Sequence, residues 1–321
     1  VTAVFCAGCI VGGMSDEPSI DIPVSMRGTG TAGRLLMAEW TWELLAGPAT
    51  ITEGPAWDGR RLLYTSIEDS EVRAYDPATG EMRVVYHETG GTNGLTFGPD
   101  GLLYGCAGTA RQVVRWDVGG NKEIIAERFE GNRLNSPNDL VVDRQGRVWF
   151  TDPRYGEDHS DRELDHDSVY RLTPPASGGD EWSIERMTFD TTRPNGILLS
   201  ADERTLYVAQ SNHTPSEPRQ LRAYPVREDG TLGPSTVLHD FGPWRGIDGM
   251  RWNGEGQIVA TCGSVKGGPG PRIAIFATDG TVLEEHPLPA GDPTNCCFAG
   301  TDWRTLFVTT LDGRLYRAIL D

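Results

Sequence analysis

The chain has 321 residues and a formal net charge of −17. Because nucleic-acid-binding surfaces are normally basic, this charge argues against a nucleic-acid partner. No apolar run is long enough to cross a membrane as a helix, so the sequence predicts no transmembrane segment. Length alone allows two domains. With 40 glycines and 21 prolines, however, turns are so frequent that internal repeats have to be sought first.

The six cysteines bear on the compartment in which the protein works. Cys106 and Cys262 fall in apolar strand patterns, which is typical of small core residues, and Cys296 and Cys297 are adjacent. No spacing resembles the disulfide framework of a secreted domain, which favours a reducing, cytoplasmic location. Export or lipoprotein anchoring is the alternative, because Cys6-Ala7-Gly8-Cys9 loosely resembles a lipoprotein processing site.

The first 34 residues are rich in Gly, Ser, Thr and Pro and predict an irregular arm. Residues 40–44 then alternate between apolar and polar side chains, as a half-buried strand does. This strand precedes every repeat described below. We therefore expect it to pair with the C-terminal end of the chain and to close a ring of sheets, which would protect their edges.

A short motif recurs six times along the rest of the chain. A polar residue, here called the head, is followed by a small or acidic residue, and an apolar run comes 10 or 11 positions later, beyond a turn. The heads are Glu53, Asn93, Asn138, Asn195, Asp248 and Asn295, at steps of about 40 to 57 residues. This spacing is typical of four-stranded propeller blades, whereas no segment holds the 3.6-residue period of a helical repeat. The sequence predicts an all-β, six-bladed β-propeller over residues 35–321 as a single domain.

The topology of a propeller blade places the six heads together. The first strand of each blade is innermost, and the loop before it lies on the same face as the loop between the second and third strands. The heads should therefore converge at one mouth of the central channel. The surrounding loops differ in length, with long ones at residues 155–167, 211–219 and 264–271. Such variation over a regular scaffold is typical of a rim that sets specificity.

The chemistry of the heads favours a cation at this mouth. Asn and Asp are common in turns at strand entry, which could explain single members of the set, but Glu53 has no such preference. The carboxylates of Glu53 and Asp248 would repel each other unless a cation lay between them. Oxygen ligands without His or Cys suit Ca²⁺, whereas Zn²⁺ prefers imidazole or thiolate and Mg²⁺ a stricter octahedron. One divalent ion is predicted, Ca²⁺ first, with Zn²⁺, Mn²⁺ or Mg²⁺ as alternatives.

Five motifs in order resemble the gluconolactonase, or senescence marker protein (regucalcin), family. They are Glu53-Gly54-Pro55-Ala56-Trp57, Asn135-Ser136-Pro137-Asn138-Asp139-Leu140, Thr151-Asp152-Pro153-Arg154-Tyr155-Gly156, Arg193-Pro194-Asn195-Gly196-Ile197 and Asp248-Gly249-Met250. The match runs from about residue 40 to the C-terminus. The resemblance implies a six-bladed propeller with one central divalent metal. It also implies the metal ligands, which are Glu53, Asn138, Asn195 and Asp248.

The resemblance further implies hydrolysis of sugar lactones. The metal would polarise the lactone carbonyl, and a water deprotonated by Asp248 as general base would attack it. Polar groups near the mouth are candidates for holding sugar hydroxyls, namely Asn93, Asn135, Tyr155 and His213. Asn295 would support the ligands from behind. The family often has a small residue where Arg154 stands, so Arg154 could favour an acidic substrate or simply face solvent.

Two other functions use the same residues. A central metal also serves phosphotriester hydrolysis, as in the diisopropyl fluorophosphatase relatives, but the polar rim favours a polyol lactone over an apolar phosphotriester. In the second alternative the propeller is a non-catalytic binding module with a structural metal. Carboxylates at both Glu53 and Asp248 argue against that, because a structural channel could be filled with apolar side chains. The oligomeric state is not predicted.

Overall fold

The computed structural model describes residues 40–155, 159–176, 179, 181–212, 214, 216–300 and 302–320. These residues belong to the compact unit Glu39–Asp321. The predicted arm over residues 1–34, the cysteines at positions 6 and 9, and His213 lie outside the described residues. Within the ranges described, no helix is long and apolar enough to cross a membrane.

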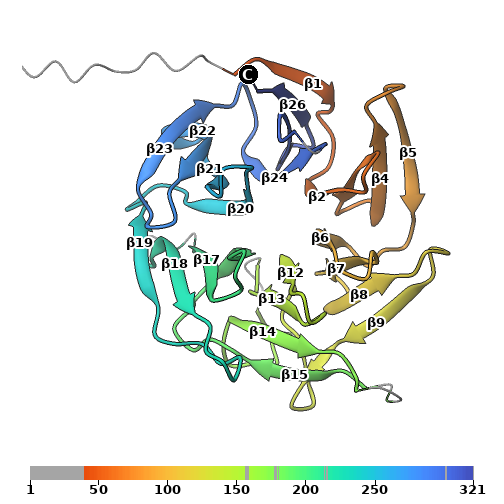
Figure 1. The fold of residues 1–321 in the computed structure, drawn as a ribbon, viewed down its shortest axis with the longest axis vertical. Coiled ribbons are helices and arrows are strands. Elements are labelled where there is room, and N and C mark those ends of the chain that lie inside the picture. The colour runs from red at the N-terminus through yellow and green to blue at the C-terminus, as the bar shows by residue number, and fades with distance from the viewer. Residues whose placement is uncertain are drawn as a thin grey trace, which may run out of the picture. The chain divides into compact units, whose positions relative to one another are not determined.

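Six four-stranded antiparallel sheets are arranged around a central axis as the blades of a propeller (Figure 1). Blade 1 consists of β2 (Thr52–Trp57), β3 (Leu62–Ser66), β4 (Glu71–Asp76) and β5 (Glu81–Tyr86). Blade 2 consists of β6 (Thr92–Phe97), β7 (Leu103–Ala107), β8 (Gln112–Trp116) and β9 (Lys122–Ala126). A short hairpin of β10 (Arg128–Phe129) and β11 (Asn132–Arg133) follows. Blade 3 consists of β12 (Leu140–Val142), β13 (Val148–Asp152), β14 (Ser168–Thr173) and β15 (Ser183–Arg186).

The second half of the chain repeats this order and then closes the ring. Blade 4 consists of β16 (Pro194–Leu199), β17 (Thr205–Ser211), β18 (Arg219–Pro225) and β19 (Thr236–Asp240). Blade 5 consists of β20 (Ile247–Trp252), β21 (Ile258–Ser264), β22 (Gly267–Phe276) and β23 (Val282–Pro287). Blade 6 consists of β24 (Pro293–Ala299), β25 (Thr305–Thr310), β26 (Leu315–Ile319) and, from the other end of the chain, β1 (Trp42–Ala46).

Strand β1 fastens the two ends of the propeller to each other. It pairs antiparallel with β26, and Glu43 accepts a hydrogen bond of 3.0 Å from the Nε of Arg317. The indole N–H of Trp42 also donates to the carbonyl of Pro287 in blade 5, at 2.9 Å. The predicted six-bladed propeller, closed by a strand near residue 40, is confirmed.

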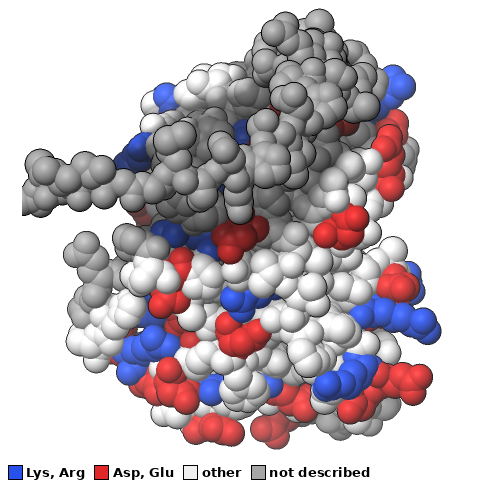
Figure 2. Space-filling model, turned by 90° about the vertical axis from the view of Figure 1, so that its left-hand side faces the viewer, with Lys and Arg blue, Asp and Glu red and all other residues white. Residues whose placement is uncertain are grey.

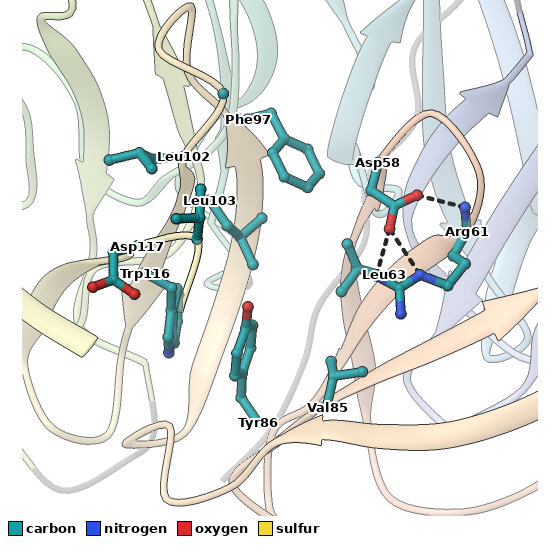
Figure 3. A pocket seen from close by; sticks show the side chains of 12 residues that line it. Asp58, Arg61, Leu63, Val85, Tyr86, Phe97, Leu102, Leu103, Trp116 and Asp117 are labelled. Carbon is teal, nitrogen blue, oxygen red and sulfur yellow. Dashed lines mark hydrogen bonds and ion pairs between the residues drawn. The ribbon is translucent and has the colours of Figure 1, made fainter. Parts of the chain in front are cut away.

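Apolar side chains fill the space between neighbouring blades. Between blades 1 and 2, Tyr86 and Trp116 stack with their ring centroids 5.4 Å apart. Beside them lies a small cleft of about 150 Å³, bordered by the ion pair of Asp58 with Arg61 (Figure 3). All four described cysteines are buried free thiols, which confirms the prediction that Cys106 and Cys262 are core residues. On the face shown in Figure 2, acidic and basic side chains are interspersed over the described residues.

The heads sit at irregularities in the innermost strands. In five of the six blades, the register between the first two strands shifts around the head, from a paired residue that is the head itself or lies one or two positions before it. The shifts lie between Glu53 and Ala56, Thr92 and Leu95, Pro194 and Ile197, Ile247 and Met250, and Pro293 and Cys296. In blade 3, Asn138 lies two residues before the paired strand β12, which begins at Leu140. A bulge of this kind changes the direction in which a side chain points.

Glycine follows the head in four blades because the inner strands approach one another closely there. A Cβ on Gly94 would lie 2.7 Å from the carbonyl oxygen of Asn138 in the next blade. A Cβ on Gly54 would lie 2.7 Å from the backbone nitrogen of Leu95 and would also collide with the Asn93 carbonyl. Gly196 meets the Asp248 carbonyl in the same way. Only a residue without a side chain fits this spacing.

Buried threonine hydroxyls join the blades around the channel. The hydroxyl of Thr65 donates to the carbonyl of Asn93 at 3.0 Å, and that of Thr151 donates to the carbonyl of Asn195 at 2.8 Å. Between blades 6 and 1, Thr294 donates to the carbonyl of Thr52 at 2.8 Å. Since two of these carbonyls belong to heads, the hydroxyls fix the backbone from which the head side chains project.

Replacing Gly94 by Ala should destabilise the propeller. The new methyl group overpacks the contact between blades 2 and 3, and overpacking of this kind typically costs about 1–3 kcal/mol. Chemical denaturation measures the loss. Gly267→Ala is the matched control, because its Cβ would meet only the Trp244 ring at an ordinary 3.4 Å. Equal stabilities for the two variants would show that the inner strands are not packed as described.

Candidate active site

A cavity of about 280 Å³ lies at one mouth of the central channel. All six blades contribute to its lining, which consists of Ile51, Glu53, Ile67, Asn93, Asn138, Tyr155, Asn195, Ser211, Arg245, Asp248 and Leu311. Five of the six predicted heads are therefore together in one cavity. Of the four predicted substrate-contact residues, Asn93 and Tyr155 lie on its surface.

The two carboxylates of the cavity are almost completely buried. Glu53 on β2 is 4% exposed and Asp248 on β20 is 8% exposed. Burial raises the pKa of Glu53 well above its usual range, and the charges of Asp248 and Asp139 raise it further. Burial also raises the pKa of Asp248, to about 6, although the Arg245 guanidinium and the Asn195 side chain oppose the shift. The surroundings therefore disfavour the charged forms of both carboxylates, and a cation bound between them would favour those forms.

Arg245 is the functional residue that sequence reasoning missed. Its guanidinium forms an ion pair with Asp248 through Oδ2. The same guanidinium donates to the carbonyls of Gly263 at 2.8 Å and Pro293 at 3.0 Å, so its position is fixed by the backbone of blades 5 and 6. The sequence offers one signal for this residue, which is its place three residues before the acidic head Asp248, in a loop at the mouth.

The amide side chains present oxygens to the cavity. The Nδ2 of Asn195 donates to the Tyr155 hydroxyl at 2.7 Å, which fixes the orientation of the amide. The Oδ1 atoms of Asn93 and Asn138 are buried and have no hydrogen-bond partner within the described part of the chain. Buried polar atoms are nearly always satisfied, so two unpartnered oxygens in one cavity indicate a place for a ligand.

A second group of polar residues supports the heads from deeper in the channel. Asn295 lies outside the cavity lining, and its Nδ2 donates to the Asp139 carboxylate at 3.3 Å. The Arg251 guanidinium lies 3.7 Å from the same carboxylate and is half-buried. A hydrogen bond from Asn295 also opposes the rise in the pKa of Glu53. Asn295 therefore connects two buried carboxylates, and Arg251 balances part of their charge.

The other predicted substrate contacts lie elsewhere. Asn135 is completely buried and does not line the cavity. Its Nδ2 donates to the carbonyls of Asp152 at 3.2 Å and His166 at 3.1 Å, which ties together the loops of blade 3. His213 lies outside the described residues. The roles assigned to these residues stay predictions.

The composition of the cavity decides which metal it could hold. Within the described ranges, no three His, Cys, Asp or Glu side chains converge. A metal bound here would instead have two carboxylates, from Glu53 and Asp248, and the amide oxygens of Asn138 and Asn195. Such an all-oxygen set suits a hard cation.

Residues 51–312 match the family described as the SMP-30/Gluconolactonase/LRE-like region. The chain belongs to this family. A gluconolactonase from Zymomonas mobilis is 30% identical to it over 295 residues, which cover 83% of this chain and 78% of that protein. The solved structure of a gluconolactonase from Xanthomonas campestris is 32% identical, with a TM-score of 0.75 and coverage of 88% of this chain and 91% of that chain.

A regucalcin structure from Agrobacterium tumefaciens shares the fold at 20% identity, with a TM-score of 0.69 and coverage of 87% of this chain and 93% of that chain. The predicted family is therefore confirmed. Its members include the gluconolactonases just named. The protein is an enzyme that hydrolyses the ester bond of sugar lactones.

Replacing Arg251 by Met should destabilise the fold strongly, because it leaves Asp139 buried without its counter-charge. Removing one partner of a buried ion pair costs about 3–5 kcal/mol. Chemical denaturation measures the loss, and adding Asp139→Asn to the same chain should restore part of it. Arg60→Met is the matched control. It also removes the partner of an aspartate, Asp76, but the Arg60 side chain is exposed, so the substitution should cost under about 1 kcal/mol. A double variant no more stable than Arg251→Met would contradict the pairing.

Proposed function

We propose that this lactonase acts on aldono-lactones such as glucono-1,5-lactone, which it opens to the free acid, and that it depends on one divalent metal ion. The ion would be held by Glu53, Asn138, Asn195 and Asp248. One observation carries the proposal. Two buried carboxylates and a buried amide oxygen without a partner face one cavity at the channel mouth of a gluconolactonase-family propeller.

The side chains present fit such an ion. Burial and mutual repulsion disfavour the charged form of Glu53 in the protein alone, and a cation would reverse that. The ligand set contains only oxygen, which favours Ca²⁺ over Zn²⁺, and Mn²⁺ and Mg²⁺ are the other candidates. The regucalcin that shares the fold is described as a calcium-binding protein, which adds support for Ca²⁺.

When bound, the ion would supply Lewis-acid polarisation of the lactone carbonyl. The residues of the chain would do the rest. Arg245 holds Asp248 through Oδ2, and the Asp248 carboxylate would take a proton from the attacking water. The water oxygen forms a bond with the carbonyl carbon, the ring C–O bond breaks, and the ring oxygen leaves as a hydroxyl after receiving a proton. Because burial raises the pKa of Asp248 to about 6, its carboxylate is a stronger base than that of a surface Asp.

Polar groups around the carboxylates would position the sugar. Burial raises the pKa of the Tyr155 phenol, so this group stays protonated at neutral pH and can donate a hydrogen bond. The Tyr155 oxygen also accepts a hydrogen bond from the Nδ2 of Asn195, which places the phenol beside a predicted metal ligand. The Oδ1 of Asn93, which has no hydrogen-bond partner in the described residues, can accept a hydrogen bond from a substrate hydroxyl.

Phosphotriester hydrolysis is the second candidate, because aliphatic side chains also line the cavity. Such a surface suits an apolar leaving group, whereas the sequence alone predicts a polar rim. Turnover of paraoxon in the presence of Ca²⁺ would support this function. Family membership places lactones first.

The direct test of the proposed function is hydrolysis of glucono-1,5-lactone followed by proton release. Treatment with a chelator should abolish turnover, because Glu53 and Asp248 then lack their counter-charge and the carbonyl is not polarised. Ca²⁺, Mn²⁺ and Zn²⁺ are added back separately, and Ca²⁺ should restore the rate. Full activity after exhaustive chelation would contradict the proposed metal requirement. No turnover with any metal would contradict the proposed substrate.

Replacing Asp248 by Asn should lower kcat for the lactone by roughly 10²–10⁴-fold, the contribution expected of a general base. The fold should survive, because Asn keeps the shape of the side chain, and circular dichroism checks this. Asp279→Asn, in the exposed turn before β23, is the matched control and should retain the wild-type rate. A folded Asp248→Asn enzyme with wild-type kcat would show that another group accepts the proton.

A further inference from the structure

One side of the active-site cavity is formed by aliphatic side chains. These are Ile51, Ile67 and Leu311, called here the apolar wall. Ile51 precedes β2, Ile67 begins the turn between β3 and β4, and Leu311 lies in the turn between β25 and β26. Ile51 and Ile67 are half-buried, and Leu311 is 41% exposed. Apolar side chains left accessible inside a binding cavity mark a surface that an apolar group can cover.

The apolar wall faces the polar side of the cavity. It is carried by blades 6 and 1, and in a ring of six the blades across the channel are blades 3 and 4 (Figure 1). Those blades contribute Tyr155, Asn195 and Ser211 to the same cavity. A lactone held between the two sides would therefore have one edge among hydrogen-bonding groups and the other edge against aliphatic carbon.

Two backbone N–H groups of the apolar wall already have partners and cannot donate to a substrate hydroxyl. The N–H of Ile67 already donates to the carbonyl of Ile51 at 3.0 Å, and the N–H of Leu311 donates to the carbonyl of Asp292 at 2.9 Å. A substrate hydroxyl placed against this side would leave water without gaining a partner, which is unfavourable. A methyl group in the same place would give up no hydrogen bond with water and would bury apolar surface.

We propose that the apolar wall selects lactones in which the carbon farthest from the carbonyl bears no hydroxyl. The preferred substrates would be 6-deoxyhexonolactones, or lactones with another short alkyl substituent at that end, rather than fully hydroxylated hexonolactones. This inference rests on the proposed function, because it requires the lactone to bind in this cavity with its carbonyl at Glu53 and Asp248. It assigns Ile51, Ile67 and Leu311 as specificity-determining residues.

The test compares two substrates that differ in one hydroxyl. The value of kcat/KM is measured by proton release, with Ca²⁺ present and spontaneous opening subtracted, for D-glucono-1,5-lactone and for 6-deoxy-D-glucono-1,5-lactone. The deoxy substrate should be favoured by roughly 10-fold or more, the scale of discrimination expected for one small group in an apolar pocket. Leu311→Gln and the double variant Ile67→Thr with Leu311→Gln should bring the ratio of the two values towards one. Thermal melting confirms that each variant is folded.

Leu44→Gln is the matched control, because Leu44 is an exposed leucine on β1, outside the cavity lining. Its ratio should equal that of the wild type. A wild-type ratio of one or less, with Ca²⁺-dependent turnover of the gluconolactone intact, would overturn the inference and leave the proposed function standing. A wild-type preference that persists in the double variant would also overturn it, since the selection would then come from elsewhere. Turnover of neither lactone would overturn the proposed function and the inference with it.

Discussion

The close approach of the inner strands around the channel is the constraint on which the rest of the structure depends. Neighbouring blades meet at the heads with room for only a hydrogen on Gly54, Gly94 and Gly196. Threonine hydroxyls from the second strands hold the head carbonyls in place. With the backbone fixed in this way, and with bulges at the same positions, the head side chains have no space to turn away from the channel.

This crowding brings buried carboxylates close together, and the nearby arginines balance only part of their negative charge. Asp248 is paired with Arg245, and Asp139 lies near Arg251. Glu53 receives a hydrogen bond from the backbone of Gly54 and forms no salt bridge with the described residues. The remaining negative charge lies beside unpartnered amide oxygens, at the end of the channel where a substrate can enter. The proposed cation would complete this balance.

The heads and the closing strand could be predicted from the sequence because they recur at a fixed place in each blade. A repeat of that kind determines which face of which strand a residue occupies, so the spacing alone is enough to place Glu53, Asn138 and Asp248 together. The roles proposed for them come from the resemblance of the motifs to the family. The long loop of blade 3 is also expected at the mouth, and Tyr155 is there.

The remaining parts of the site depend on how non-repeating loops meet, which no periodic pattern contains. Arg245 reaches Asp248 because two carbonyls from different blades orient its guanidinium. The apolar wall joins residues from opposite ends of the chain, Ile51 and Leu311, which become neighbours only when the ring closes. Asn135 stands beside a predicted ligand in the sequence, yet hydrogen bonds with loop carbonyls keep it buried.

The central claim is that the heads form one cation site. Isothermal titration of Ca²⁺ into chelator-treated protein tests it most directly, because it requires no substrate. Wild-type protein should bind one ion per chain, and Glu53→Gln, which removes one charge without changing the shape of the side chain, should bind it at least about 10-fold more weakly, a loss of roughly 1.4 kcal/mol. Binding of equal strength and stoichiometry in both proteins, or no binding in the wild type, would contradict the assignment of the heads as a metal site.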